Sequence, residues 1–232
     1  MNVALFTGIR ELEICERSMP ILERPGDVLL QIETVGVCGS DIHYYTEGRI
    51  GGQVIEHPAT LGHECAGTVV EVGPAVAELK AGQRVAIDPA ISCGRCDQCE
   101  QGRSHTCRNL KFLGCPGQAP GAAAEYITID AGSCYPIPDS MTMVQAALVE
   151  PLSVAIHAQN IAGMQPGGAV GILGSGPIGL SVLLAVGALC PGRTYVTDLL
   201  DNRLELAKRC GADWTGVPTS EDVVKAILKE EP

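Results

Sequence analysis

The residues with the clearest chemical potential in this chain are a histidine and a glutamate that are adjacent in the sequence. His63 and Glu64 lie in the glycine-containing segment 61–73 and precede an apolar run, with Cys38 upstream and Glu150 downstream. Mixed sulfur, nitrogen and oxygen ligands with one open position are typical of a catalytic zinc ion. We therefore expect Cys38, His63 and Glu64 to bind zinc, with Glu150 as a fourth ligand or as a contact through water.

Polar side chains close to Cys38 in the sequence could assist catalysis at such a zinc ion. Ser40 and His43 offer a hydroxyl and an imidazole that could relay a proton from the metal to solvent. Asp41 could accept a hydrogen bond from a ligand imidazole and so fix its tautomer. The alternatives are structural, because a single cysteine such as Cys38 is more often a buried thiol and a single glutamate such as Glu150 is more often a surface charge.

Four further cysteines form a cluster with the spacing C-x2-C-x2-C-x7-C. They are Cys93, Cys96, Cys99 and Cys107. Four thiolates can close around one tetrahedral zinc ion and leave no open position, so we expect a structural metal site here. The surrounding loop contains little that could pack as a core, and the metal would replace that core. An iron–sulfur cluster, metal-free thiols and disulfides are the alternatives that the spacing leaves open.

A glycine-rich turn at residues 174–179, Gly-Ser-Gly-Pro-Ile-Gly, matches the pattern G-x-G-x-x-G. It follows a predicted strand and opens a predicted helix, and Asp198 comes nineteen residues after Gly179, at the end of the next predicted strand. This context is typical of a dinucleotide-binding turn, in which the helix N-terminus faces the pyrophosphate. The predicted cofactor contacts are Gly174, Gly176, Pro177, Ile178, Gly179, Asp198 and Arg203.

The carboxylate of Asp198 favours NAD over NADP. It can accept hydrogen bonds from the adenine ribose, and it would repel a 2′-phosphate. Arg203 could weaken that preference or cover the adenine. A tight strand-to-helix turn without any ligand is the alternative interpretation of the motif.

The elements that must position these residues change in character near residue 141. Residues 1–150 contain short apolar runs at 28–35, 65–72, 84–87 and 125–129, separated by turn signals, and predict a barrel-like β domain with long loops. Beyond it, alternating strands and helices predict a parallel sheet. We expect a helix at 141–162 that Pro151 interrupts or kinks, strands at 169–173 and 194–198, and helices at 176–190, 201–210 and 220–229.

Composition narrows the class of protein. The chain has 232 residues, 46% of them hydrophobic, which suffices for two domains, assigned here to residues 1–150 and 151–232. A net charge of -11 argues against nucleic acid or an anionic membrane as a partner. No apolar window is long enough for a transmembrane helix and no signal peptide is recognisable, so the eleven cysteines indicate a reducing cytoplasm.

Taken together, the motifs resemble the zinc-dependent medium-chain dehydrogenases/reductases, and among them the sorbitol (polyol) dehydrogenase group. The matching segments are 37–45, 48–51, 62–64, the four-cysteine cluster, 150–157 and 174–179. The resemblance implies a GroES-like catalytic domain followed by a Rossmann domain. It implies that Cys38, His63 and Glu64 bind catalytic zinc, that Glu150 lies at or beside the metal, and that Tyr44 lines the polyol pocket. Alcohol dehydrogenases have a cysteine where Glu150 stands, so Glu150 indicates the polyol group.

The same resemblance implies an activity, which is the oxidation of a secondary alcohol of a polyol to a ketone with hydride transfer to NAD. Ser40 would take the proton of the alcohol, and His43 would pass it towards solvent through the cofactor ribose. A threonine or glucose dehydrogenase relative is an alternative, since the cysteine cluster and the Gly-His-Glu segment are widely shared.

Length is the one departure from the family. Its members continue well beyond residue 232, so we expect a parallel sheet of at most three strands, about half of the usual six. A zinc-binding fragment without catalytic activity is therefore a further alternative. Family members are expected to be homo-oligomers, and this expectation is weaker for the shorter chain.

Overall fold

The computed structural model describes residues 1–230, and the chain divides into two compact units. The first unit is Met1–Glu150, and the second begins at Pro151. Each unit has its own sheet and its own hydrophobic core, and each is described by itself below.

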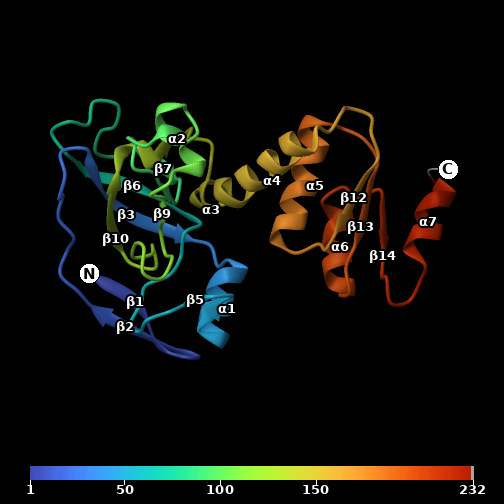
Figure 1. Cartoon of the computed structure of the whole chain (residues 1–232), viewed down its shortest axis with the longest axis horizontal. Coiled ribbons are helices and arrows are strands. Elements are labelled where there is room, and N and C mark those ends of the chain that lie inside the picture. The colour runs from blue at the N-terminus through green and yellow to red at the C-terminus, as the bar shows by residue number, and fades with distance from the viewer. Residues whose placement is uncertain (231–232) are drawn as a thin grey trace. The chain divides into compact units, whose positions relative to one another are not determined.

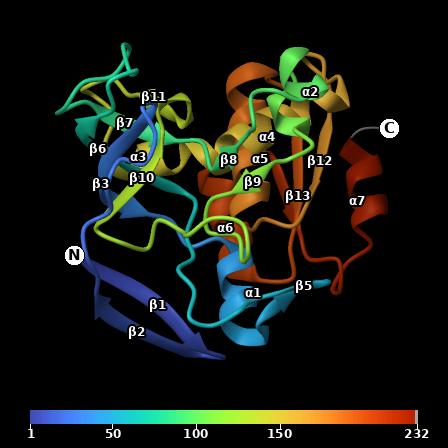
Figure 2. The same cartoon turned by 60° about the vertical axis from the view of Figure 1, so that its left-hand side comes forward.

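The first unit is built around a five-stranded antiparallel sheet with the strand order β10-β3-β6-β7-β11, whose strands are labelled in Figures 1 and 2, β11 in Figure 2 only. The strands are β3 (Asp27–Val35), β6 (Cys65–Val72), β7 (Arg84–Ile87), β10 (Tyr126–Asp130) and β11 (Cys134–Pro136). Apolar side chains of these strands, among them Val28, Leu30, Val69 and Val85, are almost completely buried and form the core. The four strands predicted in this region are therefore confirmed, and β11 adds an edge strand.

Short hairpins and helical turns surround this sheet. The hairpins are β1 (Asn2–Gly8) with β2 (Glu11–Glu16), β4 (Arg49–Ile50) with β5 (Gln53–Val54), and β8 (Ala90–Ile91) with β9 (Lys111–Phe112). The helical segments are α1 (Gly39–Glu47), α2 (Asp97–Glu100), and the 3-10 turns Ser104–Thr106 and Ala131–Ser133. Most of these elements are too short to show a clear hydrophobic period, so the sequence patterns did not predict them.

The helix predicted at 141–162 is two helices, α3 (Met143–Ala147) and α4 (Val149–Ala162). Thr142 caps α3, because its Oγ1 accepts a hydrogen bond from the backbone N–H of Gln145 at 3.2 Å. The break falls at Leu148, three residues before Pro151, so the predicted interruption is present, one turn ahead of the proline that cannot donate to the carbonyl of Ala147. Pro151 is the third residue of α4, where its missing N–H would have no partner within the helix in any case.

The second unit contains a parallel sheet of three strands in the order β12-β13-β14. Its elements after α4 are β12 (Val170–Leu173), α5 (Pro177–Leu189), β13 (Thr194–Thr197), α6 (Asp201–Arg209), β14 (Trp214–Gly216) and α7 (Val223–Glu230). Figures 1 and 2 show α5 and α6 on one side of this sheet and α7 on the other. This is the beginning of a Rossmann sheet, as predicted. The strand β14 was not predicted, because it has only three residues.

Within residues 1–230, none of the helices has the length and apolar character needed to cross a membrane.

Candidate functional site

The first candidate site begins at the N-terminus of α1. Cys38 is the residue that precedes this helix, and Ser40, Asp41 and His43 lie in its first two turns. Asp41 is buried, and its carboxylate accepts the backbone N–H of Cys38 at 3.0 Å and that of Gly62 at 3.2 Å. One side chain therefore joins the Cys38 segment to the segment that carries His63.

Asp41 does not have the predicted role as a partner of a ligand imidazole. Both of its oxygens accept backbone N–H groups instead, because the residue occupies the third position of α1, where a carboxylate reaches back to the start of the helix. Asp41 would still support a bound metal, because it holds the backbone of Cys38 and the backbone of Gly62, the residue before His63.

Strand register explains why Cys38 and His63 meet. The antiparallel strands β3 and β6 pair Val35 with Cys65, so the residues after β3 and the residues before β6 lie at the same end of the sheet. Gly62 has a φ of 93°, which a residue with a side chain rarely adopts. The backbone N–H of Gly36 donates to the carbonyl oxygen of Glu64 at 2.6 Å and ties the two segments together.

Cys38, His63 and Glu64 form a compact set of possible metal ligands. One ligand atom from each lies within 4.8 Å of the other two, and His63 and Glu64 are each only 8% exposed. The set offers one thiol, one imidazole nitrogen and one carboxylate oxygen, which together fit a zinc ion with one open position. The three predicted ligands are therefore brought together from two segments that are distant in sequence.

Glu150 is close to this set but is not part of it. Among residues 1–230, the set within 4.8 Å contains Cys38, His63 and Glu64 without Glu150. Burial raises the pKa of Glu150 to about 7, and the negative charges of Glu64 and Asp88 add to the rise. A carboxyl group with such a pKa can take up or release a proton near neutral pH.

The remaining predicted residues of this site lie on α1 with different exposure. Ser40 is half-buried, whereas His43 is exposed and its Nδ1 lies 3.3 Å from Glu47 Oε1. Tyr44 is 4% exposed and packs among Phe6, Ile55 and Leu61. Cys38, Ser40 and His43 thus come from one helix N-terminus, while the Tyr44 ring is embedded in a small core cluster.

The second candidate metal site is the four-cysteine cluster in the loop around α2. Ligand atoms of Cys93, Cys96, Cys99 and Cys107 lie within 4.8 Å of one another, and all eleven cysteines of the chain are free thiols. The Cys107 sulfur accepts backbone N–H groups from Cys93 at 3.2 Å and from Asn109 at 3.4 Å. Such N–H donors stabilise thiolates, so the arrangement fits a closed tetrahedral zinc site.

Charges and hydrogen bonds around the cluster favour thiolates at some positions. A hydrogen bond from the backbone of Arg95 and one from Cys107 lower the pKa of Cys93 to about 6. Partial burial, together with hydrogen bonds to Cys96 and Cys107, raises the pKa of Cys99 to about 11. Arg108 forms a two-point ion pair with Asp97, at 2.5 Å and 2.8 Å, across the outside of the loop. Within the segment 93–107, only Cys107 is buried, so the loop has no hydrophobic core of its own.

The glycine-rich turn joins β12 to α5 in the second unit. A side chain at Gly179 would overlap the carbonyl oxygen of Gly174, so the helix can start this close to the strand only with glycine there. Pro177 and Ile178 are the first residues of α5, and Gly176 precedes the helix. The N–H groups at the start of α5 are thus available to an anion, as in dinucleotide-binding turns.

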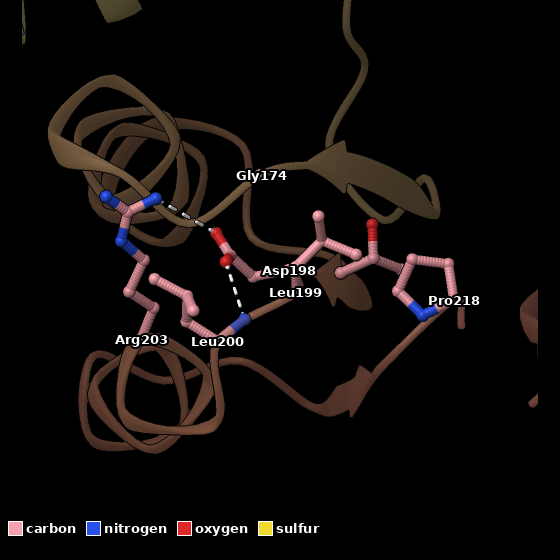
Figure 3. A pocket seen from close by; sticks show the side chains of 7 residues that line it. Gly174, Asp198, Leu199, Leu200, Arg203 and Pro218 are labelled. Carbon is pink, nitrogen blue, oxygen red and sulfur yellow. Dashed lines mark hydrogen bonds and ion pairs between the residues drawn. The ribbon is translucent and has the colours of Figure 1, made fainter. Parts of the chain in front are cut away.

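A pocket of about 470 Å³ lies beside this turn. Its lining is Gly174, Thr197, Asp198, Leu199, Leu200, Arg203 and Pro218. Figure 3 shows the Asp198 carboxylate between the guanidinium of Arg203 and the backbone nitrogen of Leu200. The Arg203 Nη1 atom lies 3.7 Å from Asp198 Oδ2.

Asp198 is 8% exposed and is held by its own surroundings. Its Oδ2 accepts the N–H of Ser175 at 2.8 Å and the Ser175 hydroxyl at 3.2 Å, and its Oδ1 accepts the N–H of Leu200 at 3.0 Å. Burial acts to raise the pKa of Asp198, but these hydrogen bonds and the charge of Arg203 outweigh it and lower the pKa. The group is therefore a fixed negative charge at the end of β13.

Comparison with known proteins gives the family. Residues 24–139 match the alcohol dehydrogenase GroES-like domain. The chain is 44% identical over 212 residues to the sorbitol dehydrogenase of Bacillus subtilis, which covers 91% of this chain and 60% of the relative. It is 42% identical over 210 residues to the L-idonate 5-dehydrogenase of Vitis vinifera, covering 90% of this chain and 57% of the relative.

Solved structures agree with this result. An alcohol dehydrogenase from Escherichia coli CFT073 in complex with NADH is 30% identical with a TM-score of 0.90, covering 100% of this chain and 66% of that one. A zinc-binding dehydrogenase from Sinorhizobium meliloti 1021 bound to NADP is 33% identical with a TM-score of 0.86, covering 97% and 64%.

The chain thus belongs to the zinc-dependent medium-chain dehydrogenase/reductase family, and its relatives include polyol dehydrogenases. It has the GroES-like domain and part of the Rossmann domain of that family, as predicted. It spans about 60% of the length of the curated relatives it matches.

Proposed function

We propose that the protein oxidises a secondary alcohol of a polyol to a ketone, with NAD as the hydride acceptor and zinc as the metal. The observation that carries the proposal is the grouping of Cys38, His63 and Glu64 within 4.8 Å. A mixed thiolate, imidazole and carboxylate set with an open position suits a metal that must bind substrate. The names of the sorbitol and L-idonate dehydrogenases support a polyol as the substrate class.

In this proposal each residue has a defined task at the first site. Cys38, His63 and Glu64 hold the zinc ion, which when bound supplies the Lewis acidity that lowers the pKa of a substrate hydroxyl. Ser40 accepts the hydroxyl proton, and His43, exposed one turn further along α1, passes it to solvent. Glu150 provides a further carboxyl group whose charge interacts with that of Glu64.

The cofactor site is assigned to the second unit. The N–H groups at the start of α5 bind the pyrophosphate, and the Asp198 carboxylate accepts the hydroxyls of the adenine ribose. Arg203 covers the adenine side of the pocket. Relatives differ in cofactor, since one solved structure holds NADH and another NADP, so the preference for NAD rests on the charge of Asp198.

The four-cysteine cluster has a structural task in this proposal. It holds a second zinc ion with all four positions filled, which leaves no position for substrate.

Turnover and metal content together test the proposed function. The purified chain is incubated with NAD and separately with sorbitol, xylitol, threonine or glucose, while NADH absorbance is followed and zinc is counted per chain. We expect two zinc ions per chain and turnover with the polyols, and we expect His63→Ala to lose one zinc and all turnover. Cys15→Ala, a cysteine change in β2 away from both sites, is the matched control and keeps both. Two zinc ions per chain without turnover would contradict the proposed activity and show that this chain binds zinc without being an enzyme by itself. Turnover with threonine or glucose, and none with the polyols, would show that the substrate is not a polyol.

A further inference from the structure

Three side chains, those of Tyr44, Gln53 and Cys115, lie together beside the first metal site, and Gln53 and Cys115 are not among its predicted residues. The Gln53 Nε2 atom donates to the Cys115 sulfur at 2.8 Å and to the carbonyl oxygen of Pro116 at 3.3 Å. The Tyr44 hydroxyl lies close to the same Cys115 thiol, and burial together with this thiol raises the pKa of Tyr44. Gln53 lies in β5, Tyr44 in α1, and Cys115 in the loop after β9, so the thiol joins three separate segments.

The loop that carries Cys115 is closed on itself by hydrogen bonds. The Cys115 N–H donates to the carbonyl oxygen of Phe112 at 3.1 Å, and the Gln118 N–H donates to the carbonyl oxygen of Cys115 at 3.0 Å. The Gln118 side-chain oxygen in turn accepts the N–H of Phe112 at 2.9 Å. These hydrogen bonds tie the backbone of Cys115 to that of Phe112.

The same loop packs against a predicted zinc ligand. The rings of Phe112 and His63 meet edge to face, with centroids 5.3 Å apart. Gly114 lies against Gly62, so closely that a side chain at Gly114 would come within 2.7 Å of the Gly62 carbonyl oxygen. The loop thus contacts both the residue that bears the imidazole and the residue before it.

These contacts close a ring of three segments. Asp41 ties α1 to Gly62, Gly62 and His63 pack on the loop at Gly114 and Phe112, and Cys115 returns from the loop to Tyr44 on α1. The last of these three contacts is made by the side chains of Tyr44 and Cys115, neither of which is a predicted zinc ligand. Gln53 holds that contact from outside the ring.

We propose that Gln53 and Cys115 are positioning residues of the zinc site, because through Tyr44 they hold α1, which follows Cys38, against the loop that packs on His63. The proposal rests on the proposed zinc site and deepens it. Gln53 and Cys115 act on the metal ligands through the residues between them. Their task is to keep the thiol of Cys38 and the imidazole of His63 at a fixed separation when no metal is bound.

Gln53 and Cys115 should contribute modestly to zinc affinity, because they act on the ligands through other residues. Groups that bond directly to a metal ligand contribute about 10- to 100-fold to metal affinity, and a group one contact further away contributes less, so we expect about threefold to tenfold. Serine in place of Cys115 keeps a donor and acceptor at this position, whereas alanine removes both. This difference separates a hydrogen-bonding role from simple packing.

The test measures zinc affinity and needs no turnover. Each chain is loaded with two zinc ions and titrated with a chromophoric chelator, and the ion lost by His63→Ala is taken as the ion of the first site. We expect Cys115→Ala, Gln53→Leu and Tyr44→Phe each to weaken this ion about threefold to tenfold. We expect Cys115→Ser to restore most of the affinity, and the four-cysteine ion to stay unchanged in every variant.

A double variant supplies the decisive result. Because Tyr44 and Cys115 act through one contact, Tyr44→Phe combined with Cys115→Ala is expected to be no weaker than either change alone. Cys15→Ala is the matched control and leaves both ions unchanged. Unchanged affinity in all three single variants, additive losses in the double variant, or a Cys115→Ser variant as weak as Cys115→Ala would each overturn the proposal. A wild-type chain with only one zinc ion would instead overturn the proposed zinc site itself.

Discussion

Replacing Asp198 with alanine should change which dinucleotide the second unit prefers. Its carboxylate is a fixed charge at the pocket beside the glycine-rich turn. An adenine ribose can donate hydrogen bonds to it, whereas a 2′-phosphate would bring a second negative charge close to it. Asp198→Ala removes both the acceptor for NADH and the repulsion of NADPH. We therefore expect NADH to bind more weakly and NADPH to bind relatively better.

The size of the effect can be worked out from the charges. At an effective dielectric constant of about 20, two unit charges 5 Å apart repel by about 3 kcal/mol. The guanidinium of Arg203, 3.7 Å from Asp198 Oδ2, offsets part of this field, and salt screens more of it. A remaining difference of about 1.4 to 2.8 kcal/mol corresponds to a change of about 10- to 100-fold in the ratio of the two dissociation constants.

The ratio is the quantity to measure, because Asp198→Ala also affects folding. The change leaves the N–H groups of Ser175 and Leu200 without their acceptor, and each such loss costs about 1 to 3 kcal/mol. A partly unfolded protein binds both dinucleotides more weakly by the same factor, which cancels in the ratio. Fluorescence titration of NADH and NADPH into wild type and variant gives this ratio directly.

Asp213→Ala is the matched control for this experiment. Asp213 accepts a backbone N–H and a hydroxyl from Thr194, at 2.8 Å and 3.0 Å, much as Asp198 does from Ser175, but it does not line the pocket. We expect this control to lose stability with no change in the ratio. A ratio that stays the same in Asp198→Ala, or that moves equally in both variants, would refute the assignment of Asp198 as the group that selects the cofactor.

Three further predictions concern the first unit. Gly36→Ala places a methyl group into the Glu64 carboxylate and should weaken the first-site zinc about threefold to tenfold in chelator competition, whereas Gly39→Ala, with open space around it, should not. Cys107→Ala should speed hydrogen exchange at residues 93–109 on the order of a hundredfold, as read by mass spectrometry, with exchange in β3 unchanged. In the metal-free chain, the raised pKa of Glu150 means that the folded state binds more protons between about pH 4.5 and 7, so the unfolding free energy falls across that window and is level above it. Glu150→Gln should therefore be more stable by about 1 to 2 kcal/mol at pH 8 in denaturant titrations, a figure reduced for partial exposure, and equal stability there would contradict the prediction.

Local patterns in the sequence predicted much of the fold. The glycine-rich turn and the cysteine cluster each lie within a single short segment, so spacing alone indicates which residues meet. The strands of the five-stranded sheet were predicted because their apolar runs are long and buried. Pro151 indicated an interruption in the helical stretch 141–162, but the position of the break at Leu148 does not alter the apolar pattern and could not be predicted from it.

The assembly of the first site depends on contacts between distant segments. Cys38 meets His63 because β3 and β6 pair with Val35 opposite Cys65, and the spacing of the residues does not encode that register. Asp41 was recognised as a supporting residue, but its partners proved to be backbone groups of both segments. Gln53 and Cys115 went unrecognised, since a glutamine and a single cysteine 62 residues apart give no signal until the fold brings them together.

The absence of a hydrophobic core in the segment 93–107, where only Cys107 is buried, has a consequence for the environment in which the protein works. In the proposed structural site the metal takes the place of that core, so the stability of this segment is set by the free zinc concentration around it. As long as free zinc stays well above the dissociation constant, each tenfold fall in its concentration removes about 1.4 kcal/mol from that stability. The five-stranded sheet carries its own apolar core and does not share this dependence. The two parts of one unit would thus respond to different variables, the sheet to temperature and the cysteine segment to metal supply.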